Sequence, residues 1–259
     1  MPIADDETAP NSLTRRTLEV CVDSAAGLLA AVRAGADRIE LCSALGLAGL
    51  TPPPGLMRLA ATLSCPAYAM IRPNPGDYVL TPSDIDVMRG DIDAALEVGL
   101  PGVVLGACRP GGELDEEVLG RLIEQADGRG ATLHRVFDAA PDMSRALDIA
   151  IVLGFERVLT SGGAPGAPQG VDVIAGLVEQ SAGRISVMAG AGLNPGNLAE
   201  VIRRTGVHEV HGSCGAPFAW PDARRAATLD RVYGGGFSAI RVTDEATVAA
   251  MVAILREMD

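Results

Sequence analysis

The segment GADRIELC, residues 35–42, sets a pattern that recurs along the chain: a glycine ends a helical stretch and, four residues later, a β-branched residue opens a short apolar strand. The same spacing appears at residues 99–103, 154–158 and 206–210. The glycines lie 64, 55 and 52 residues apart, which is about twice the length of one strand-plus-helix unit. The pattern therefore predicts eight strands and eight helices.

Eight strands can be assigned from short apolar runs, each followed by a helical pattern. The expected strands are residues 18–22, 38–42, 67–72, 102–106, 131–137, 157–161, 185–189 and 209–213. The helix expected from residue 82 is the clearest, because Thr81 and Asp84 form a capping box around Pro82. Strands that alternate with helices require right-handed crossovers and a parallel sheet. The absence of a G-x-G-x-x-G turn after the first strand favours a barrel over an open sheet.

The predicted fold is therefore an α/β structure, a (β/α)₈ TIM barrel in a single domain over residues 17–259. Its core must be aliphatic, because 48% of residues are hydrophobic but only 3% are aromatic. Residues 1–16 are polar and acidic and are expected to form a disordered tail. Residues 212–242 are too long for an ordinary connection, so they form either a flap or an extra short element.

The charge and the apolar pattern exclude some functions. A net charge of −12 disfavours nucleic acid as a partner, since binding to phosphates is driven by basic side chains. The sequence contains no uncharged apolar run of eighteen residues, so it predicts no membrane span. Its first residues do not resemble a secretion signal. We therefore expect a cytoplasmic protein. The five cysteines form no C-x-x-C pair, which argues against a disulfide framework or a zinc finger.

Polar residues gather near the carboxyl ends of the predicted strands, where barrels of this type carry their active sites. Period two places Glu19 with Cys21, and Glu40 with Cys42, on the inner face of the first two strands. Buried carboxylates need cationic partners, and we expect Arg72, Arg135 and two histidines to supply them. The alternative is an ion-pair network that only stabilises the barrel.

The segment HRVFD, residues 134–138, brings together an acid/base group, a cation and a carboxylate. In an extended strand His134 and Arg135 face opposite ways, unless the strand bends. His134 is the better candidate for proton transfer, since imidazole titrates near neutrality. The catalytic candidates are Glu19, Glu40, Arg72, His134 and Asp138.

The loops after the last two strands are the usual phosphate site of this fold. Gly190 and Gly192 follow the seventh strand and precede a helix, and Ser213 ends the eighth. Exposed glycine N–H groups and a helix amino end attract anions, so these three residues are the candidate anion site. The alternative is a simple tight turn.

Eight short motifs follow one another along the chain: LEVC at 18–21, GADRIELC at 35–42, GLTP at 49–52, MIRP at 70–73, GD at 76–77, HRVFD at 134–138, RVLTSG at 157–162 and MAGAG at 188–192. Together, in this order and spacing, they resemble the CutC family over about residues 17–220. The resemblance implies a TIM barrel, a role in cytoplasmic copper homeostasis, Cu(I) bound by Cys21 and Cys42, and a homodimer or higher homo-oligomer. Thiolates are soft ligands that suit Cu(I).

This chain departs from the family pattern at the mouth of the predicted barrel. Asn74 and Pro75 stand where the family commonly has a second arginine and a glycine, which removes one cation. The serine pair after His211 reads Gly212-Ser213, and Cys214 follows it as an added thiol.

Two functions therefore remain open, besides a purely structural role. The first is copper binding through Cys21 and Cys42. The second is an enzyme that acts on a small anionic metabolite, with His134 as acid/base, Glu19 or Glu40 as the complementary carboxylate, and Arg72 as the anion clamp.

Overall fold

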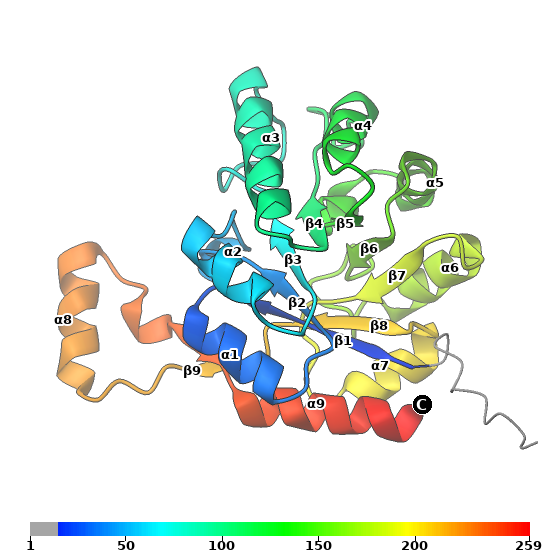
Figure 1. Cartoon of the computed structure of the whole chain (residues 1–259). Helices are drawn as coiled ribbons and strands as arrows, with labels where there is room; N and C mark the ends of the chain where they lie inside the picture. The colour runs from blue at the N-terminus through cyan, green and yellow to red at the C-terminus, as the bar shows by residue number, and fades with distance from the viewer. Residues whose placement is uncertain (1–14) are drawn as a thin grey trace, which may run out of the picture.

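The computed structural model describes residues 15–259, apart from the side chain of Ala223, and eight parallel strands close into a barrel (Figure 1). Each strand pairs with its neighbours in chain order, and β1 pairs with β8 to close the ring. The strands are β1 (Thr17–Val22), β2 (Arg38–Leu41), β3 (Ala67–Met70), β4 (Gly102–Leu105), β5 (Gly130–Leu133), β6 (Arg157–Thr160), β7 (Ser186–Ala189) and β8 (Glu209–Gly212). The predicted (β/α)₈ barrel is confirmed.

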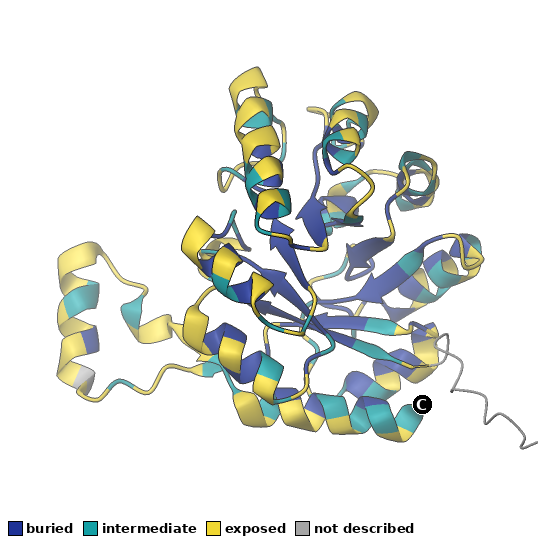
Figure 2. Ribbon diagram, viewed as in Figure 1, coloured by how far each residue is buried: buried dark blue, intermediate teal, exposed yellow. Residues whose placement is uncertain are grey.

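Helices surround the strands, which lie at the buried centre in Figure 2. They are α1 (Ala25–Arg33), α2 (Pro54–Ala61), α3 (Pro82–Glu97), α4 (Glu116–Gln125), α5 (Met143–Leu153), α6 (Val171–Ser181), α7 (Leu198–Thr205) and α9 (Glu245–Met258). The core lies between the two layers, where Val20 and Ile39 are fully buried. Alternation along each strand points these aliphatic side chains outward to the helices and leaves the opposite face for the barrel interior.

Two of the glycines in the recurring pattern cap helices directly. Gly154 ends α5 with φ of 84°, and Gly206 ends α7 with φ of 73°. This left-handed conformation is costly for residues with a Cβ atom, which is why glycine recurs at these points.

The fifth strand ends earlier than the sequence predicts. We expected a strand over residues 131–137, but β5 ends at Leu133 and a 3₁₀ helix, η2 (Arg135–Ala139), follows. His134 caps η2, because its Nδ1 atom accepts a hydrogen bond from the N–H of Val136 at 3.2 Å. The apolar run of Val136 and Phe137 reads as a strand, but both side chains are buried at the start of the loop instead.

The stretch after β8 leaves the barrel as an arm, defined as residues 215–243. It contains β9 (Gly215–Pro217), α8 (Ala223–Tyr233), η3 (Phe237–Ala239) and β10 (Arg241–Thr243). The strands β9 and β10 pair antiparallel at its base, and α8 stands away from the barrel in Figure 1. Of the two alternatives for residues 212–242, the extra element is the one observed, and it is centred on an 11-residue helix.

The predicted disordered tail falls mostly outside the described residues, since these begin at residue 15. Arg15 and Arg16, its last two residues, have defined contacts. Arg15 pairs with Asp37 at 3.0 Å, and the backbone N–H of Arg16 donates to Asp259 at 2.7 Å. The Arg16 contact holds the start of β1 against the end of α9, and the Arg15 contact joins it to the turn before β2.

Candidate functional site

A charged network fills the barrel interior near the amino ends of the strands. Arg38 donates to both Glu19 and Glu209, and Arg157 donates from Nε to Glu209 at 3.1 Å. Both guanidinium groups also stack over the ring of Tyr68, at 5.7 and 5.0 Å from its centroid. The partner of Glu19 is therefore Arg38, and neither Arg72 nor Arg135 pairs with Glu19 or Glu40 as we had expected. Period two could have identified Arg38, since it shares the inner face with Glu40.

Above this network, three potential ligands converge from neighbouring strands. Cys21 from β1, Glu40 from β2 and His211 from β8 each offer one ligand atom, and these atoms lie within 4.8 Å of one another. The strand register explains the meeting, because Cys21 lies opposite Glu40 and β8 pairs with β1 on the other side. All three residues are buried. This group is called the Cys-Glu-His cluster below.

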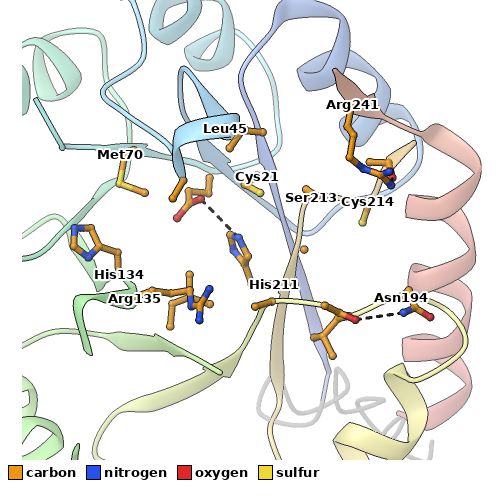
Figure 3. Close-up of a pocket in the computed structure, with 18 of the residues that line it drawn as sticks. Cys21, Leu45, Met70, His134, Arg135, Asn194, His211, Ser213, Cys214 and Arg241 are labelled. Carbon is orange, nitrogen blue, oxygen red and sulfur yellow. Dashed lines mark hydrogen bonds and ion pairs between the residues drawn. The ribbon is translucent and has the colours of Figure 1, made fainter. Parts of the chain in front are cut away.

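The imidazole of His211 is oriented by Glu19. Its Nδ1 atom lies 2.8 Å from Glu19 Oε1. Its Nε2 atom lies 3.7 Å from Glu40 Oε2, and this second contact is the dashed line at the His211 ring in Figure 3. A carboxylate at Nδ1 fixes the hydrogen there, which leaves Nε2 directed into the cluster. Metal-binding histidines commonly have this carboxylate partner, which sets the tautomer and the ring orientation.

Burial and charge together set the protonation of these groups. Burial opposes ionisation of Glu19, but Arg38 and His211 outweigh it and lower the pKa of Glu19 to about 2. Burial raises the pKa of Glu40 and of the Cys21 thiol. For His211, burial favours the neutral ring, but the neighbouring carboxylates Glu40 and Glu19 raise its pKa well above the usual value. A metal ion entering the cluster would have to displace protons from Cys21 and His211.

Cys42 lies beside the cluster and is not one of its three members. Its thiol donates to Glu40 Oε2 at 3.5 Å, and the residue is fully buried against Tyr68, Met70 and Val104. Burial raises the pKa of the Cys42 thiol, and the Glu40 charge adds to the effect. Of the two predicted thiolate ligands, only Cys21 therefore belongs to the cluster, and Cys42 is joined to it through its contact with Glu40.

A cavity of about 710 Å³ opens above the cluster at the carboxyl ends of the strands. Cys21, Glu40 and His211 belong to strands and line its inner end, whereas loop residues such as Gly192 and Ser213 line its outer part. In Figure 3, Cys21 and His211 lie between His134 and Met70 on one side and Cys214 and Arg241 on the other. The cavity is large enough for a metabolite-sized ligand.

Arg72 lines this cavity, but its contacts are to backbone. Its Nη1 atom donates to the carbonyl oxygens of Leu47 and Gly49, at 2.8 and 3.0 Å, and Nη2 donates to Gly76 at 3.4 Å. The guanidinium also lies 4.8 Å from the ring centroid of Tyr78. Arg72 thus fastens the loops after β2 and β3.

Asp138 is occupied by bonds to neighbouring residues. It pairs with Arg135 at 2.7 Å and accepts from the Thr160 hydroxyl at 2.5 Å and from the Ser161 and Gly163 N–H groups. These bonds join the loops after β5 and β6, so the observed role of Asp138 is to fix their position. Its catalytic role remains a prediction.

His134 is held in a single neutral form. Because its Nδ1 accepts from Val136, its ring hydrogen lies on Nε2. Burial and the charge of Arg72 lower the pKa of His134 to about 3. At neutral pH the His134 ring is therefore an uncharged hydrogen-bond donor at Nε2. Its lowered pKa disfavours the charged imidazolium form at the pH values at which histidines usually transfer protons.

The tautomer of His134 can be tested by nitrogen NMR. We expect the ¹⁵N shifts of His134 to show a neutral ring with hydrogen on Nε2 throughout pH 5–8, because the lowered pKa keeps the charged form out of this range. The His134→Phe variant provides the control, since its spectrum should lack the signals assigned to His134. Titration of His134 between pH 5 and 8 would contradict the assignment.

The predicted anion site is only partly available. The N–H of Gly190 donates to Thr160 at 2.9 Å as part of the barrel, so it cannot bind an anion. A Cβ atom at this position would meet Leu159 at 2.5 Å, which explains the glycine. Gly192 and Ser213 do line the cavity, although the Gly192 carbonyl is held by the side chains of Asn194 and Asn197.

His211 and Tyr78 are the residues whose importance the sequence analysis underestimated. His211 was noted at a strand end, but its place between Glu19 and Glu40 follows only from closure of β8 onto β1. Tyr78 gave no sequence signal, because it lies in the loop after β3.

No helix in the described part of the chain is long and apolar enough to span a membrane.

Comparison with known proteins gives a consistent result. The model of the CutC family matches residues 16–216. A CutC family protein from Caulobacter vibrioides is 55% identical over 249 residues, covering 95% of this chain and all of that protein. One from Rhizobium meliloti is 51% identical over 245 residues, covering 94% of this chain and 97% of the relative.

Solved structures agree at the level of the fold. The crystal structure of a candidate copper homeostasis protein, CutC of Streptococcus agalactiae, superposes with a TM-score of 0.74 at 29% identity and covers 76% of this chain and 98% of that one. Phosphoribosylanthranilate isomerase from Pyrococcus furiosus has a TM-score of 0.57 at 14% identity, covering 93% and 99% of the two chains. The second likeness shows only the shared barrel.

Proposed function

Because this chain belongs to the CutC family, we propose that it binds copper at the Cys-Glu-His cluster in the mouth of its barrel. The choice of copper rests on the family, since the relative from Streptococcus agalactiae is named for copper homeostasis. The choice of residues rests on the geometry of Cys21, Glu40 and His211.

One observation carries the assignment: His211 is held by Glu19 at Nδ1, which leaves Nε2 directed toward the other two potential ligands. A carboxylate–histidine pair of this kind orients ligands in many metal sites and increases their basicity. Glu40 has a second indicator, because its Oε1 atom is buried without a hydrogen-bond partner among the described residues. A metal ion would satisfy that oxygen.

The donor set suits copper. Thiolate and imidazole are good ligands for Cu(I), and the carboxylate of Glu40 adds a ligand that Cu(II) accepts. In this arrangement Cys42 positions Glu40 through its thiol and does not itself bind the ion. Arg38 and Glu19 form the supporting layer beneath.

The proposal is tested by titrating reduced protein with Cu(I) against a competing chelator. We expect one copper ion per chain, and we expect Zn(II) not to displace it. If the chelator retains all the copper, or if zinc takes its place, the proposed function is wrong.

Two serine variants distinguish a ligand set of Cys21, Glu40 and His211 from one in which Cys21 and Cys42 both bind the ion. Cys42→Ser should weaken copper binding by no more than about tenfold, because loss of an outer-shell partner typically costs 10–100-fold and serine can still donate to Glu40. Cys65→Ser is the matched control, since Cys65 lies outside the barrel mouth and donates to the Ala36 carbonyl. A loss as large for Cys42→Ser as for Cys21→Ser would instead support direct ligation by both thiols.

A further inference from the structure

Three unsatisfied polar atoms belong to side chains that line the cavity above the cluster. Among the described side chains, the buried atoms without a hydrogen-bond partner are Glu40 Oε1, Arg72 Nε, His134 Nε2 and Arg16 Nε. The first three belong to residues that line this one cavity. Buried polar groups are nearly always paired, so a cluster of exceptions on one cavity wall indicates a missing ligand.

Arg72 differs from the other buried arginines of the barrel. Arg38 and Arg157 each pair with carboxylates, whereas no carboxylate of residues 15–259 lies within 4.0 Å of Arg72 in the structure. Arg72 is only 8% exposed. A buried cation that is bound only by carbonyl oxygens keeps an uncompensated charge, which favours a negatively charged ligand.

The remaining donors of Arg72 suit a carboxylate. A guanidinium has five N–H groups, and the three described bonds use two on Nη1 and one on Nη2. This leaves the Nε–H and one Nη2–H. Arginine commonly binds a carboxylate through two parallel N–H groups of this kind.

His134 supplies a third donor close to Arg72. The two side chains contact the same ring, because Arg72 lies 4.8 Å and the His134 ring 4.9 Å from the centroid of Tyr78. The free Nε2–H of His134 is buried in a residue that is 4% exposed. Donors from the ends of β3 and β5 thus converge on one part of the cavity wall.

At the inner end of the cavity the unsatisfied group is an acceptor, Glu40 Oε1. A ligand that fills the cavity therefore needs an oxyanion at the end beside Arg72 and His134 and a hydroxyl donor at the end beside Glu40. A single uncompensated cation with a neutral imidazole, and a carboxylate nearby, favours a monoanion over a phosphate dianion.

From this arrangement the geometry points to a binding site for a small hydroxycarboxylate, with its carboxylate on Arg72 and His134 and a hydroxyl directed to Glu40. The carboxylate end of this site does not depend on copper, since Arg72 and His134 are outside the Cys-Glu-His cluster, whereas Glu40 is shared with the proposed metal site. It gives the barrel mouth a small-molecule function in addition to the proposed metal binding.

The experiment uses chelator-treated, metal-free protein and isothermal titration calorimetry. The probes are lactate, glycerate and gluconate, with propionate, lactamide and inorganic phosphate as comparisons. We expect at least one hydroxycarboxylate to bind, propionate to bind more weakly than lactate if lactate is the ligand, and lactamide not to bind. Absence of binding by all three hydroxycarboxylates would overturn the inference, as would equal binding of an acid and its amide, or preferred binding of phosphate.

Two variants locate the bound carboxylate. Arg72→Lys keeps the charge but removes the paired N–H groups, and His134→Phe keeps the ring on Tyr78 but removes the donor; each should weaken binding at least about tenfold. Arg58→Met, on the exposed face of α2, is the charge control and should leave affinity unchanged. If neither Arg72→Lys nor His134→Phe alters affinity while both remain folded by circular dichroism, the carboxylate is not bound there.

Discussion

Replacing Arg38 with methionine is expected to lower the free energy of unfolding by about 3–5 kcal/mol, because it leaves the buried carboxylate of Glu19 without its guanidinium partner, with only the imidazole of His211 beside it. Arg38 is 7% exposed and is hydrogen-bonded to both Glu19 and Glu209. Glu19 is fully buried, so it cannot recover the lost interaction from water. Urea unfolding at pH 7 measures the effect.

Two comparisons show whether charge causes this loss. Arg121→Met removes an ion pair with Glu117 in which the side chains are 61% and 70% exposed, and it should cost less than about 1 kcal/mol. The double variant Arg38→Met, Glu19→Gln neutralises the fully buried carboxylate that loses its guanidinium partner, whereas Glu209 keeps its pair with Arg157, and it should be more stable than Arg38→Met alone. A double variant that is less stable than the single one would contradict the electrostatic explanation.

The second large effect is expected at the metal ligands. His211→Ala and Cys21→Ser should each reduce copper affinity by more than about 100-fold, because loss of a direct ligand exceeds the 10–100-fold typical of outer-shell partners. His208→Ala is the matched histidine control, since this exposed residue lies outside the cavity and should leave affinity unchanged. Competition with a Cu(I) chelator gives the affinities.

Circular dichroism of the same variants separates ligand loss from unfolding. Folded His211→Ala protein that binds copper as tightly as the parent would exclude His211 from the site. Folded Cys21→Ser protein with unchanged affinity would do the same for Cys21. The account requires that His211→Ala and Cys21→Ser both lose copper affinity while His208→Ala keeps it.

The barrel could be predicted from sequence because its signals are local. A glycine at the helix end and a β-branched residue four positions later depend only on neighbouring residues, and the boundaries of β1 and β6 follow closely. The end of β5 could not be predicted in this way. Val136 and Phe137 continue an apolar run, and the turn into η2 depends on a hydrogen bond from the Val136 N–H to His134.

The site was predictable as a region but not as a set of contacts. Period two places Glu19 and Cys21 correctly in the interior, since strand alternation fixes the face. The pairing of Glu19 with Arg38, and of His211 with both Glu19 and Glu40, depends on the shear and closure of the barrel. No local pattern in the sequence encodes which inward side chains become neighbours across strands.

X-ray absorption at the copper edge of loaded protein tests the central claim most directly. The account predicts one sulfur ligand from Cys21, together with the scattering pattern of one imidazole from His211 and an oxygen from Glu40. Two sulfur ligands without an imidazole would contradict it and would place the ion between Cys21 and Cys42 instead.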